Sequence, residues 1–414
     1  MTKTKLSLVA ISLLSVATMA QADVDLKIGG QAVIYYQTED AKAPDTDMFN
    51  KDASSANFGL QLNANGDLGN DFGLGLQGTG LGTLGLEDNL VSGVRQSGLG
   101  NNGDTAKANN YFAITKAYLT KKVANTTLKM GRQELPKSLS PLAFSESWNV
   151  FKNTFDAIVA VNSDIPDTTL VGAYVDRSNN HKDLTTFDNL QTGASGASVR
   201  PNNGAYMLTA QNKSVKGLAL TGSYYGIPSG ATPHVDAFWL DAKSDLNALA
   251  QLPIKVGLQG GQLSPDGLDD TKAVGAKIGA KTNGVNLSLA YSKVGSGTLS
   301  FQNVGTGVKT PLYTQMIGNQ NFISHDNDTF VLGANMPLGN GKLIAKYDLT
   351  TDNSSAKNDY NELDLIYKTK LLGTNVLAAY VMQKSDNKIF AKDSAGTATE
   401  DTNNIIRVWT RYNF

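Results

Sequence analysis

The feature that most constrains the fold is an alternation of apolar and polar residues with a period of two. Residues 285–292, for example, read Val-Asn-Leu-Ser-Leu-Ala-Tyr-Ser, and residues 26–36, 218–224, 254–259 and 343–350 follow the same rule. A period of two indicates a β-strand with one apolar and one polar face. The pattern recurs along the chain and predicts about eighteen strands, with a count of sixteen left open.

The connections between these predicted strands differ in length in a regular way. Those after even-numbered strands are short and comprise residues 68–71, 123–126, 162–167, 214–217, 245–252, 282–284, 337–341 and 371–374. Those after odd-numbered strands are mostly long and polar: 39–54, 85–109, 136–152, 178–203, 295–327 and 385–400, with shorter ones near 226–232, 264–270 and 351–356. Tight turns at one end and long loops at the other are typical of outer-membrane barrels. We therefore predict an all-β, closed antiparallel transmembrane β-barrel with short periplasmic turns and long extracellular loops.

The first residues predict export. Lys3 and Lys5 precede an apolar run at 6–16, and Ala20-Gln21-Ala22 supplies a small-x-small cleavage pattern. These features predict a cleaved signal peptide over residues 1–22 and a barrel over 23–414. No later run of apolar residues is long enough for a spanning helix. The expected location is the outer membrane of a Gram-negative cell, reached through the periplasm.

Aromatic residues fall near the ends of the predicted strands, with the apolar parity of each strand. Such belts are expected at the lipid headgroups. The expected girdle consists of Tyr36, Tyr224, Tyr291, Tyr347, Tyr367, Tyr412 and Phe414. The final strand alternates up to its terminal aromatic, Phe414, and so resembles the assembly signal of Gram-negative outer-membrane proteins. That resemblance implies the barrel-assembly machinery as a partner, beside outer-membrane lipid.

Three segments resemble the corresponding stretch of two porin families: residues 131–136 (Gly-Arg-Gln-Glu-Leu-Pro), 153–157 (Asn-Thr-Phe-Asp-Ala) and 166–170 (Pro-Asp-Thr-Thr-Leu). The families are the substrate-selective outer-membrane porins of pseudomonads and the major outer-membrane porins of Campylobacter-like bacteria. The resemblance implies eighteen strands, a homotrimer and a water-filled channel for passive diffusion of ions and small hydrophilic solutes. A plugged barrel serving as a surface adhesin or structural protein is the main alternative, and a barrel enzyme is a weaker one.

Residues 136–152 are the expected infolded constriction loop. Two prolines and the bulky Leu142, Phe144, Trp148 and Phe151 suit packing against an inner wall, whereas a loop that caps the barrel or contacts another subunit is the alternative. The charged constriction candidates are Lys129, Arg132, Lys137, Glu146, Lys152, Arg407 and Arg411. Strict alternation from Met130 would turn Arg132 toward lipid, so its inclusion requires a bulge at Gly131, which the resemblance favours.

Other motifs carry no chemistry. The GxGxxG match at residues 73–78 lies within alternating strand sequence without a following helix, so a nucleotide-binding loop is not expected. His181, His234 and His325 lack metal-ligand spacing, and the acidic runs 266–270 and 326–328 lack a calcium-loop pattern. We therefore expect no cofactor and no metal. The formal net charge of −1 argues against a nucleic-acid partner.

Overall fold

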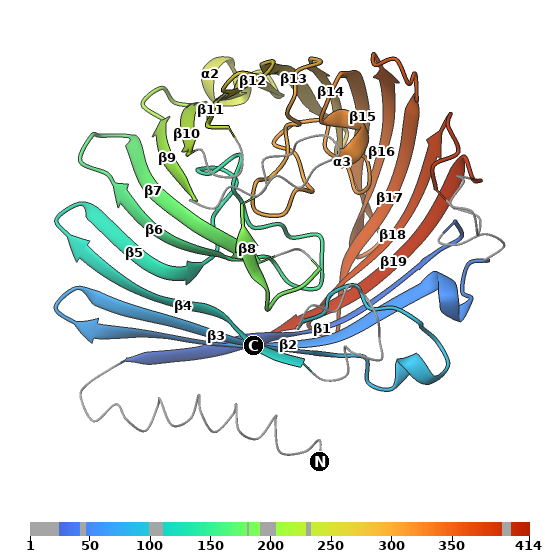
Figure 1. Ribbon diagram of the computed structural model, residues 1–414, viewed down its shortest axis with the longest axis horizontal. Coiled ribbons are helices and arrows are strands. Elements are labelled where there is room, and N and C mark those ends of the chain that lie inside the picture. The colour runs from blue at the N-terminus through green and yellow to red at the C-terminus, as the bar shows by residue number, and fades with distance from the viewer. Residues whose placement is uncertain are drawn as a thin grey trace.

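The computed structural model describes residues 25–41, 47–98, 111–179, 182–190, 204–228, 233–390 and 399–414. The predicted signal peptide lies outside them. The described chain forms one antiparallel sheet of nineteen strands that closes on itself, because β1 (Leu26–Glu39) pairs with both β2 (Ser54–Gly69) and β19 (Thr402–Asn413). One strand, β8 (Phe187–Asn189), is three residues long and pairs only with β7 (Thr168–Asn179). The remaining eighteen strands form the wall, which confirms the predicted barrel and the higher of the two strand counts (Figure 1).

The other wall strands are β3 (Phe72–Gly82), β4 (Tyr111–Val123), β5 (Thr126–Gln133), β6 (Phe155–Asn162), β9 (Ala205–Asn212), β10 (Leu218–Ile227), β11 (Val235–Asp245), β12 (Ile254–Pro265), β13 (Thr271–Thr282), β14 (Val285–Val294), β15 (Asn327–Leu338), β16 (Gly341–Asp352), β17 (Tyr360–Leu371) and β18 (Thr374–Ser385). In the described parts of the connections lie four short helices: η1 (Lys51–Ala53), η2 (Leu86–Asp88), α2 (Leu246–Ala250) and α3 (Gln320–Ile323). None of the helices in the described ranges is long and apolar enough to cross a membrane.

Two of the short connections are tight two-residue hairpin turns of the same kind. Between β13 and β14, Asn283 and Gly284 have φ values of 47° and 81°. Two consecutive left-handed residues form the turn whose twist matches that of the flanking strands, and Asn-Gly is the favoured pair. Leu372 and Gly373 repeat this geometry between β17 and β18, with φ values of 49° and 79°. The connection that the sequence left poorly defined, between β11 and β12, contains α2, whose first turn is capped by the Asp245 carboxylate.

The two faces of the wall follow the predicted alternation. On β15, Phe330 and Leu332 are exposed on the outer face, while Thr329 and Val331 are buried on the inner face. All seven predicted girdle aromatics have outer-face parity. Among them, the ring of Tyr291 lies 4.7 Å from that of Phe330, and its hydroxyl donates to Asp328 at 2.5 Å. Tyr347 lies near the middle of β16, opposite Leu332, rather than at the strand end where we expected it.

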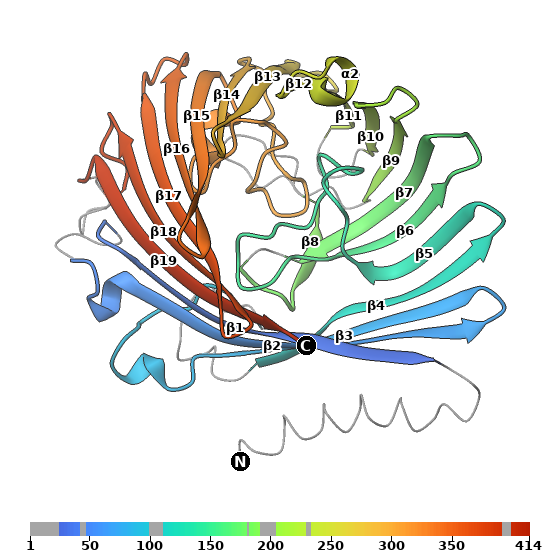
Figure 2. The same ribbon diagram turned by 180° about the vertical axis from the view of Figure 1, so that it is seen from behind.

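The buried core lies inside the barrel, where long connections fold back into the lumen. We call residues 134–154, between β5 and β6, loop A, and residues 295–326, between β14 and β15, loop B. Both lie within the ring of strands in two opposite views, loop A in teal and loop B in orange (Figures 1 and 2). Leu142 of loop A and Phe301 of loop B belong to one cluster of buried apolar side chains with Trp239 of β11.

The candidate functional site in the barrel lumen

Loop A spans the lumen. The Arg411 guanidinium of β19 donates to the carbonyl of Val150 at 2.9 Å, and the backbone N–H of Leu142 donates to the Tyr225 hydroxyl of β10 at 3.2 Å. Strands β10 and β19 are nine positions apart in the ring of eighteen wall strands, so they lie opposite each other. Loop A is thus held at both sides of the barrel.

The wall is shaped to receive loop A. Phe151 packs against Gly59 of β2 so closely that a Cβ atom there would lie 2.5 Å from its ring. The Gln96 side chain donates to the Phe151 carbonyl and accepts from its N–H, both at 2.7 Å. The end of loop A is therefore fixed at Phe151, by close packing against Gly59 and by the two hydrogen bonds to the Gln96 amide.

Loop B holds loop A from the other side. Glu146 of loop A is buried and accepts hydrogen bonds from the Asn303 side chain at 2.9 Å, from the Lys309 N–H at 3.0 Å and from the Thr306 hydroxyl. Asn303 also brackets Phe144, with bonds of 3.1 Å to its N–H and 2.7 Å to its carbonyl. These contacts satisfy polar groups that would otherwise be costly to bury, so the two loops form one interlocked unit.

Lys137 and Glu146, two of the predicted constriction charges, lie in this interlock rather than on the open lumen. The Lys137 ammonium donates to the carbonyl of Thr310 at 2.8 Å. Burial, together with the nearby charges of Lys243 and Lys309, lowers the pKa of Lys137 to about 8. Lys309 is also buried, which lowers its pKa to about 8, and it donates to the carbonyl of Ile317 at 2.6 Å. The sequence could not show these partners because they come from a loop some 160 residues away.

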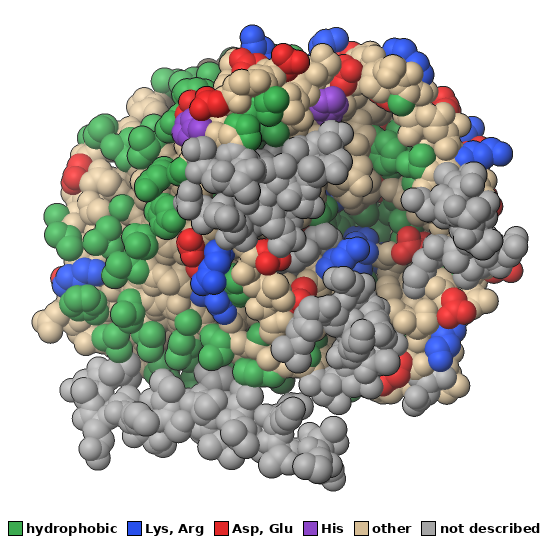
Figure 3. Space-filling model, in the orientation of Figure 1, with side chains coloured by type: hydrophobic (Ala, Val, Ile, Leu, Met, Phe, Trp, Pro, Cys, Tyr) green, Lys and Arg blue, Asp and Glu red, His purple; other side chains and the backbone are tan. Residues whose placement is uncertain are grey.

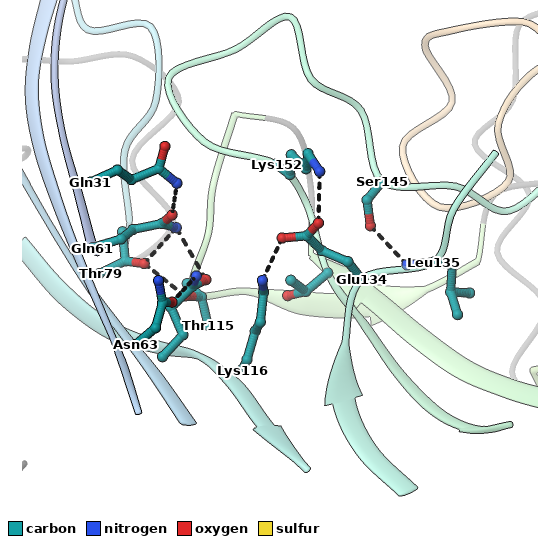
Figure 4. A network of polar contacts seen from close by, with 12 residues as sticks. Gln31, Gln61, Asn63, Thr79, Thr115, Lys116, Glu134, Leu135, Ser145 and Lys152 are labelled. Carbon is teal, nitrogen blue, oxygen red and sulfur yellow. Dashed lines mark hydrogen bonds and ion pairs between the residues drawn. The ribbon is translucent and has the colours of Figure 1, made fainter. Parts of the chain in front are cut away.

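A ring of polar side chains surrounds the open part of the lumen beside loop A. On one side Glu134 binds Lys116 at 2.6 Å and Lys152 at 2.8 Å. Although burial opposes ionisation, these two lysines hold the pKa of the Glu134 carboxyl below its usual value. Next to Lys116, inward-facing side chains of β1 to β4 form a hydrogen-bonded ladder made of Gln31, Gln61, Asn63, Gln77, Thr79 and Thr115 (Figure 4).

The ring closes through two tryptophans and three cations. Trp148 of loop A stacks on Trp409 of β19, with ring centres 6.3 Å apart and planes at 10°. Lys368 of β17 lies 5.5 Å from the Trp148 ring, and Arg411 lies 5.1 Å from the Trp409 ring. A cavity of about 540 Å³ opens here between Ser147, Trp148, Lys152, Lys368, Trp409 and Arg411. Figure 3 shows the barrel hollowed, with Lys or Arg side chains at the edge of the hollow.

Of the other predicted constriction residues, Lys129 faces the lumen and Arg407 is buried. The Lys129 ammonium lies 3.8 Å from the Tyr118 ring centre. Arg407 is buried, and it donates to Gln37 at 2.9 Å and to the carbonyl of Trp148 at 3.5 Å. It therefore supports loop A rather than facing the opening.

Arg132 departs from the expected bulge. Its register with β4 and β6 is regular, so it keeps the outer-face parity of Met130 in spite of the positive φ of Gly131. Its guanidinium pairs with Asp156 at 2.9 Å and donates to the carbonyl of Ile114 at 3.0 Å. Strand β5 ends at Gln133 while β4 continues unpaired on that side, and Arg132 fills this seam. The ion pair with Asp156 offsets the desolvation cost of turning the Arg132 guanidinium toward lipid.

A group of inward lysines on β11, β13, β16 and β17 was not among the sequence-based candidates. Lys243 of β11, Lys277 of β13, Lys346 of β16 and Lys368 of β17 lie near enough for neighbouring charges to act on one another. Strand parity was the available signal, because each lysine has the inner-face parity of its strand. What parity could not show is that they converge on one region.

Carboxylates of the wall are covered by loop B. Asp348, Glu362 and Asp364 are buried on the inner face of β16 and β17. The Ile317 N–H donates to Asp364 at 3.2 Å, the Gly318 N–H to Glu362 at 2.8 Å, and the Asn319 amide to Asp348 at 2.6 Å. No group of three or more His, Cys, Asp or Glu side chains in the described ranges has a geometry that could hold a metal ion.

Comparison with known proteins agrees with this architecture. The sequence profile of the Gram-negative porin family matches residues 7–405. The structure is similar to Pseudomonas aeruginosa OccK8 (OprE), with a TM-score of 0.74, 15% identity, and coverage of 94% of this chain and 98% of that one. Acinetobacter baumannii OccAB2 gives 0.74 and 16%, and Pseudomonas aeruginosa OpdK, solved with vanillate, gives 0.73 and 16%, both with the same coverages of 94% and 98%.

No curated protein sequence matches the chain. At such low identities the solved structures establish the fold, whereas the family match extends over nearly the whole sequence. Together with the closed barrel and its hollow lumen, the match shows that this chain belongs to the Gram-negative porin family and forms an outer-membrane channel for small solutes.

Proposed function

We propose that this porin passes small anionic solutes in preference to cations, by passive diffusion through the opening between loop A and the wall. The observation that carries this proposal is the pairing of charges along the lumen. Glu134 is shared by two lysines, Asp241 pairs with Lys243 at 3.0 Å, and Asp245 pairs with Lys255 at 3.3 Å. Within the described ranges no ion pair joins a carboxylate to Lys277, Lys346, Lys368 or Arg411.

Unpaired cations have a large effect in a narrow aqueous passage. The low-dielectric wall concentrates their field in the water of the lumen, which raises the local concentration of anions and lowers that of cations. The unpaired Lys368 and Arg411 converge on the opening beside Lys152, which shares Glu134 with Lys116, and the stacked Trp148 and Trp409 add flat apolar surface there. Loop A thereby serves as the constriction in this proposal, with Lys152 and Arg411 retained from the sequence-based candidates.

Planar-bilayer recording in asymmetric KCl tests the proposal. For the unmodified protein we expect discrete open channels whose reversal potential shows a preference for chloride over potassium. In the double variant Lys152→Gln/Lys368→Gln we expect this chloride preference to be several-fold lower. The control Lys272→Gln/Lys384→Gln removes the same charge from the outer face and should behave as the unmodified protein. Cation preference in the unmodified protein would overturn the proposal, and absence of open-state current would instead favour a plugged adhesin.

Three further parts of the proposal rest on the sequence and on the resemblance. Cleavage of the predicted signal peptide gives a mature chain that starts at Asp23, which intact-mass measurement tests. The alternating C-terminal strand, whose Phe414 exchanges hydrogen bonds of 2.8 and 3.1 Å with Gly30, is the expected contact for the barrel-assembly machinery. The mass of the detergent-solubilised particle decides whether the barrel is the expected homotrimer or a monomer.

A further inference from the structure

A second hollow in the lumen has a composition unlike that of the opening beside loop A. Its volume is about 890 Å³, and it lies between the tip of loop B, at Tyr313, and the inner wall from β11 to β16. We propose that this hollow, which we call the lysine hollow, binds solutes that carry two or more phosphate or carboxylate groups. This inference rests on the proposed function, because an anionic ligand must enter the lumen to reach the lysine hollow.

The strand register builds the lysine hollow. One row of directly paired residues runs across β12 to β16 as Lys255, Gly279, Ser288, Gly333 and Lys346. A second row pairs Lys243 with Gly257 and Gly257 with Lys277. In both rows small residues lie between lysines. In the first row the small residues leave the wall bare and create the space, which Lys255 and Lys346 flank, whereas in the second row Tyr313 lies against Gly257.

Loop B forms the roof. The Tyr313 hydroxyl donates to Asp241 at 2.9 Å, which ties the tip of the loop to β11. Tyr313 also lies against Gly257, where a Cβ atom would come within 2.7 Å of its hydroxyl oxygen. Tyr313 thereby fixes the roof at Asp241 and Gly257, and the open space lies beside it, along Gly279, Ser288 and Gly333.

The charges of the lysine hollow are unbalanced. Lys213, Lys243, Lys255, Lys277, Lys281 and Lys346 line it. Asp245 is the carboxylate of this lining and pairs with Lys255 at 3.3 Å, and Asp241 pairs with Lys243 at 3.0 Å, which leaves four lysines without an ion pair in the described ranges. The charges of Lys243 and Lys346 act on Lys277, so the ammonium groups repel one another. A ligand with several negative charges would relieve this repulsion at more than one lysine, which a singly charged anion cannot do.

The spacing of the lysines points to an extended ligand. Lys255 and Lys346 are separated by four strand-to-strand steps, each about 4.8 Å at the backbone. Ser288, Asn286 and Asn335 lie between them and offer neutral hydrogen-bond donors. Lysine is a point charge that accepts either phosphate or carboxylate oxygen without a fixed fork geometry. The site therefore selects for the number and separation of charges rather than for one kind of acid.

Isothermal titration of the full-length barrel in detergent tests the inference, with tripolyphosphate, citrate and inorganic phosphate as separate probes. We expect saturable binding of tripolyphosphate or citrate, and about tenfold weaker binding in Lys277→Gln/Lys346→Gln. Ser288→Leu, which fills the space and keeps every charge, should weaken binding similarly. Lys370→Gln, which lies outside the lysine hollow, is the matched control and should bind as the unmodified protein does.

Each outcome has a defined meaning. Binding of tripolyphosphate alone assigns phosphorylated solutes, binding of citrate alone assigns polycarboxylates, and binding of both supports selection by charge number. The inference is overturned if inorganic phosphate binds as tightly as either multivalent probe, if neither multivalent probe binds, or if Ser288→Leu and the lysine variant bind as the unmodified barrel does. An anion-selective channel without such binding would leave the proposed function standing and remove only this inference.

Discussion

The two halves of the lumen treat their charges in opposite ways. In the half that loop B fills, Glu146, Glu362 and Asp364 are buried and accept hydrogen bonds from loop groups. In the half toward the short turns, Lys346 and Lys368 face open space. The buried carboxyl groups bind loop groups and so hold the loops in place, whereas the lysines that form no ion pair with a carboxylate in the described ranges remain available to a passing solute. One set of side chains therefore positions the loops, and a different set faces the solute.

Breaking the interlock should produce the largest effect. Glu146→Ala removes the acceptor shared by Asn303, Thr306 and Lys309, and each orphaned buried donor costs about 1–3 kcal/mol. We expect loops A and B to separate, with larger and noisier single-channel conductance. Asp266→Ala, in an exposed connection, is the control and should leave the conductance unchanged. A quiet channel of normal conductance in Glu146→Ala would show that the interlock does not hold loop A.

Displacing loop A alone should have a smaller effect. A Cβ atom at Gly59 would lie 2.5 Å from the Phe151 ring, so Gly59→Ala must push this end of the loop away from β2. We expect a changed single-channel conductance with ion preference retained, because no charge is altered. Gly172→Ala is the matched control, since a Cβ atom there meets only the end of Leu208 at 3.8 Å. If Gly59→Ala and Gly172→Ala gave the same conductance, Phe151 would not position the constriction.

Removing the carboxylate that Lys116 and Lys152 share should increase the anion preference of the opening. Glu134 is held ionised by Lys116 and Lys152, which keep its pKa below the usual value against the opposing effect of burial. Glu134→Gln removes this negative charge and leaves both ammonium groups uncompensated. We expect chloride preference to rise by about twofold in reversal-potential measurements, a shift worth about 0.4 kcal/mol. Unchanged or reduced preference would contradict the role given to these lysines.

The smallest expected effect is a pH dependence of stability. The pKa of Lys137 is lowered from 10.5 to about 8 by burial, so between these values the unfolded chain binds more protons than the folded one. Stability should therefore rise with pH across this window. Lys137→Met removes the titrating group, so its gain in Tm from pH 7 to pH 9.5 should be smaller than that of the unmodified protein. An equal or larger gain would show that Lys137 is not buried as described.

The fold was largely predictable from the sequence, but the site was not. Strand parity and the lengths of the connections are local properties, and they suffice for the closed barrel of eighteen wall strands. The roles of Lys137, Glu146 and Arg407 depend on partners in distant segments, and the alternation of single strands carries no information about them. Lys346 and Lys368 had the correct parity but gave no sign of their convergence, because neighbouring lysines in a lumen lie far apart along the chain.

The separation of the two halves can be tested by comparing ion selectivity in two single variants. Lys368→Gln removes a charge that faces the opening, whereas Asp364→Asn replaces a carboxyl group that is buried beneath loop B and keeps the acceptor for the Ile317 N–H. We expect the reversal potential in asymmetric KCl to move toward cation preference in Lys368→Gln and to stay unchanged in Asp364→Asn. A shift in Asp364→Asn as large as that in Lys368→Gln would contradict this expectation.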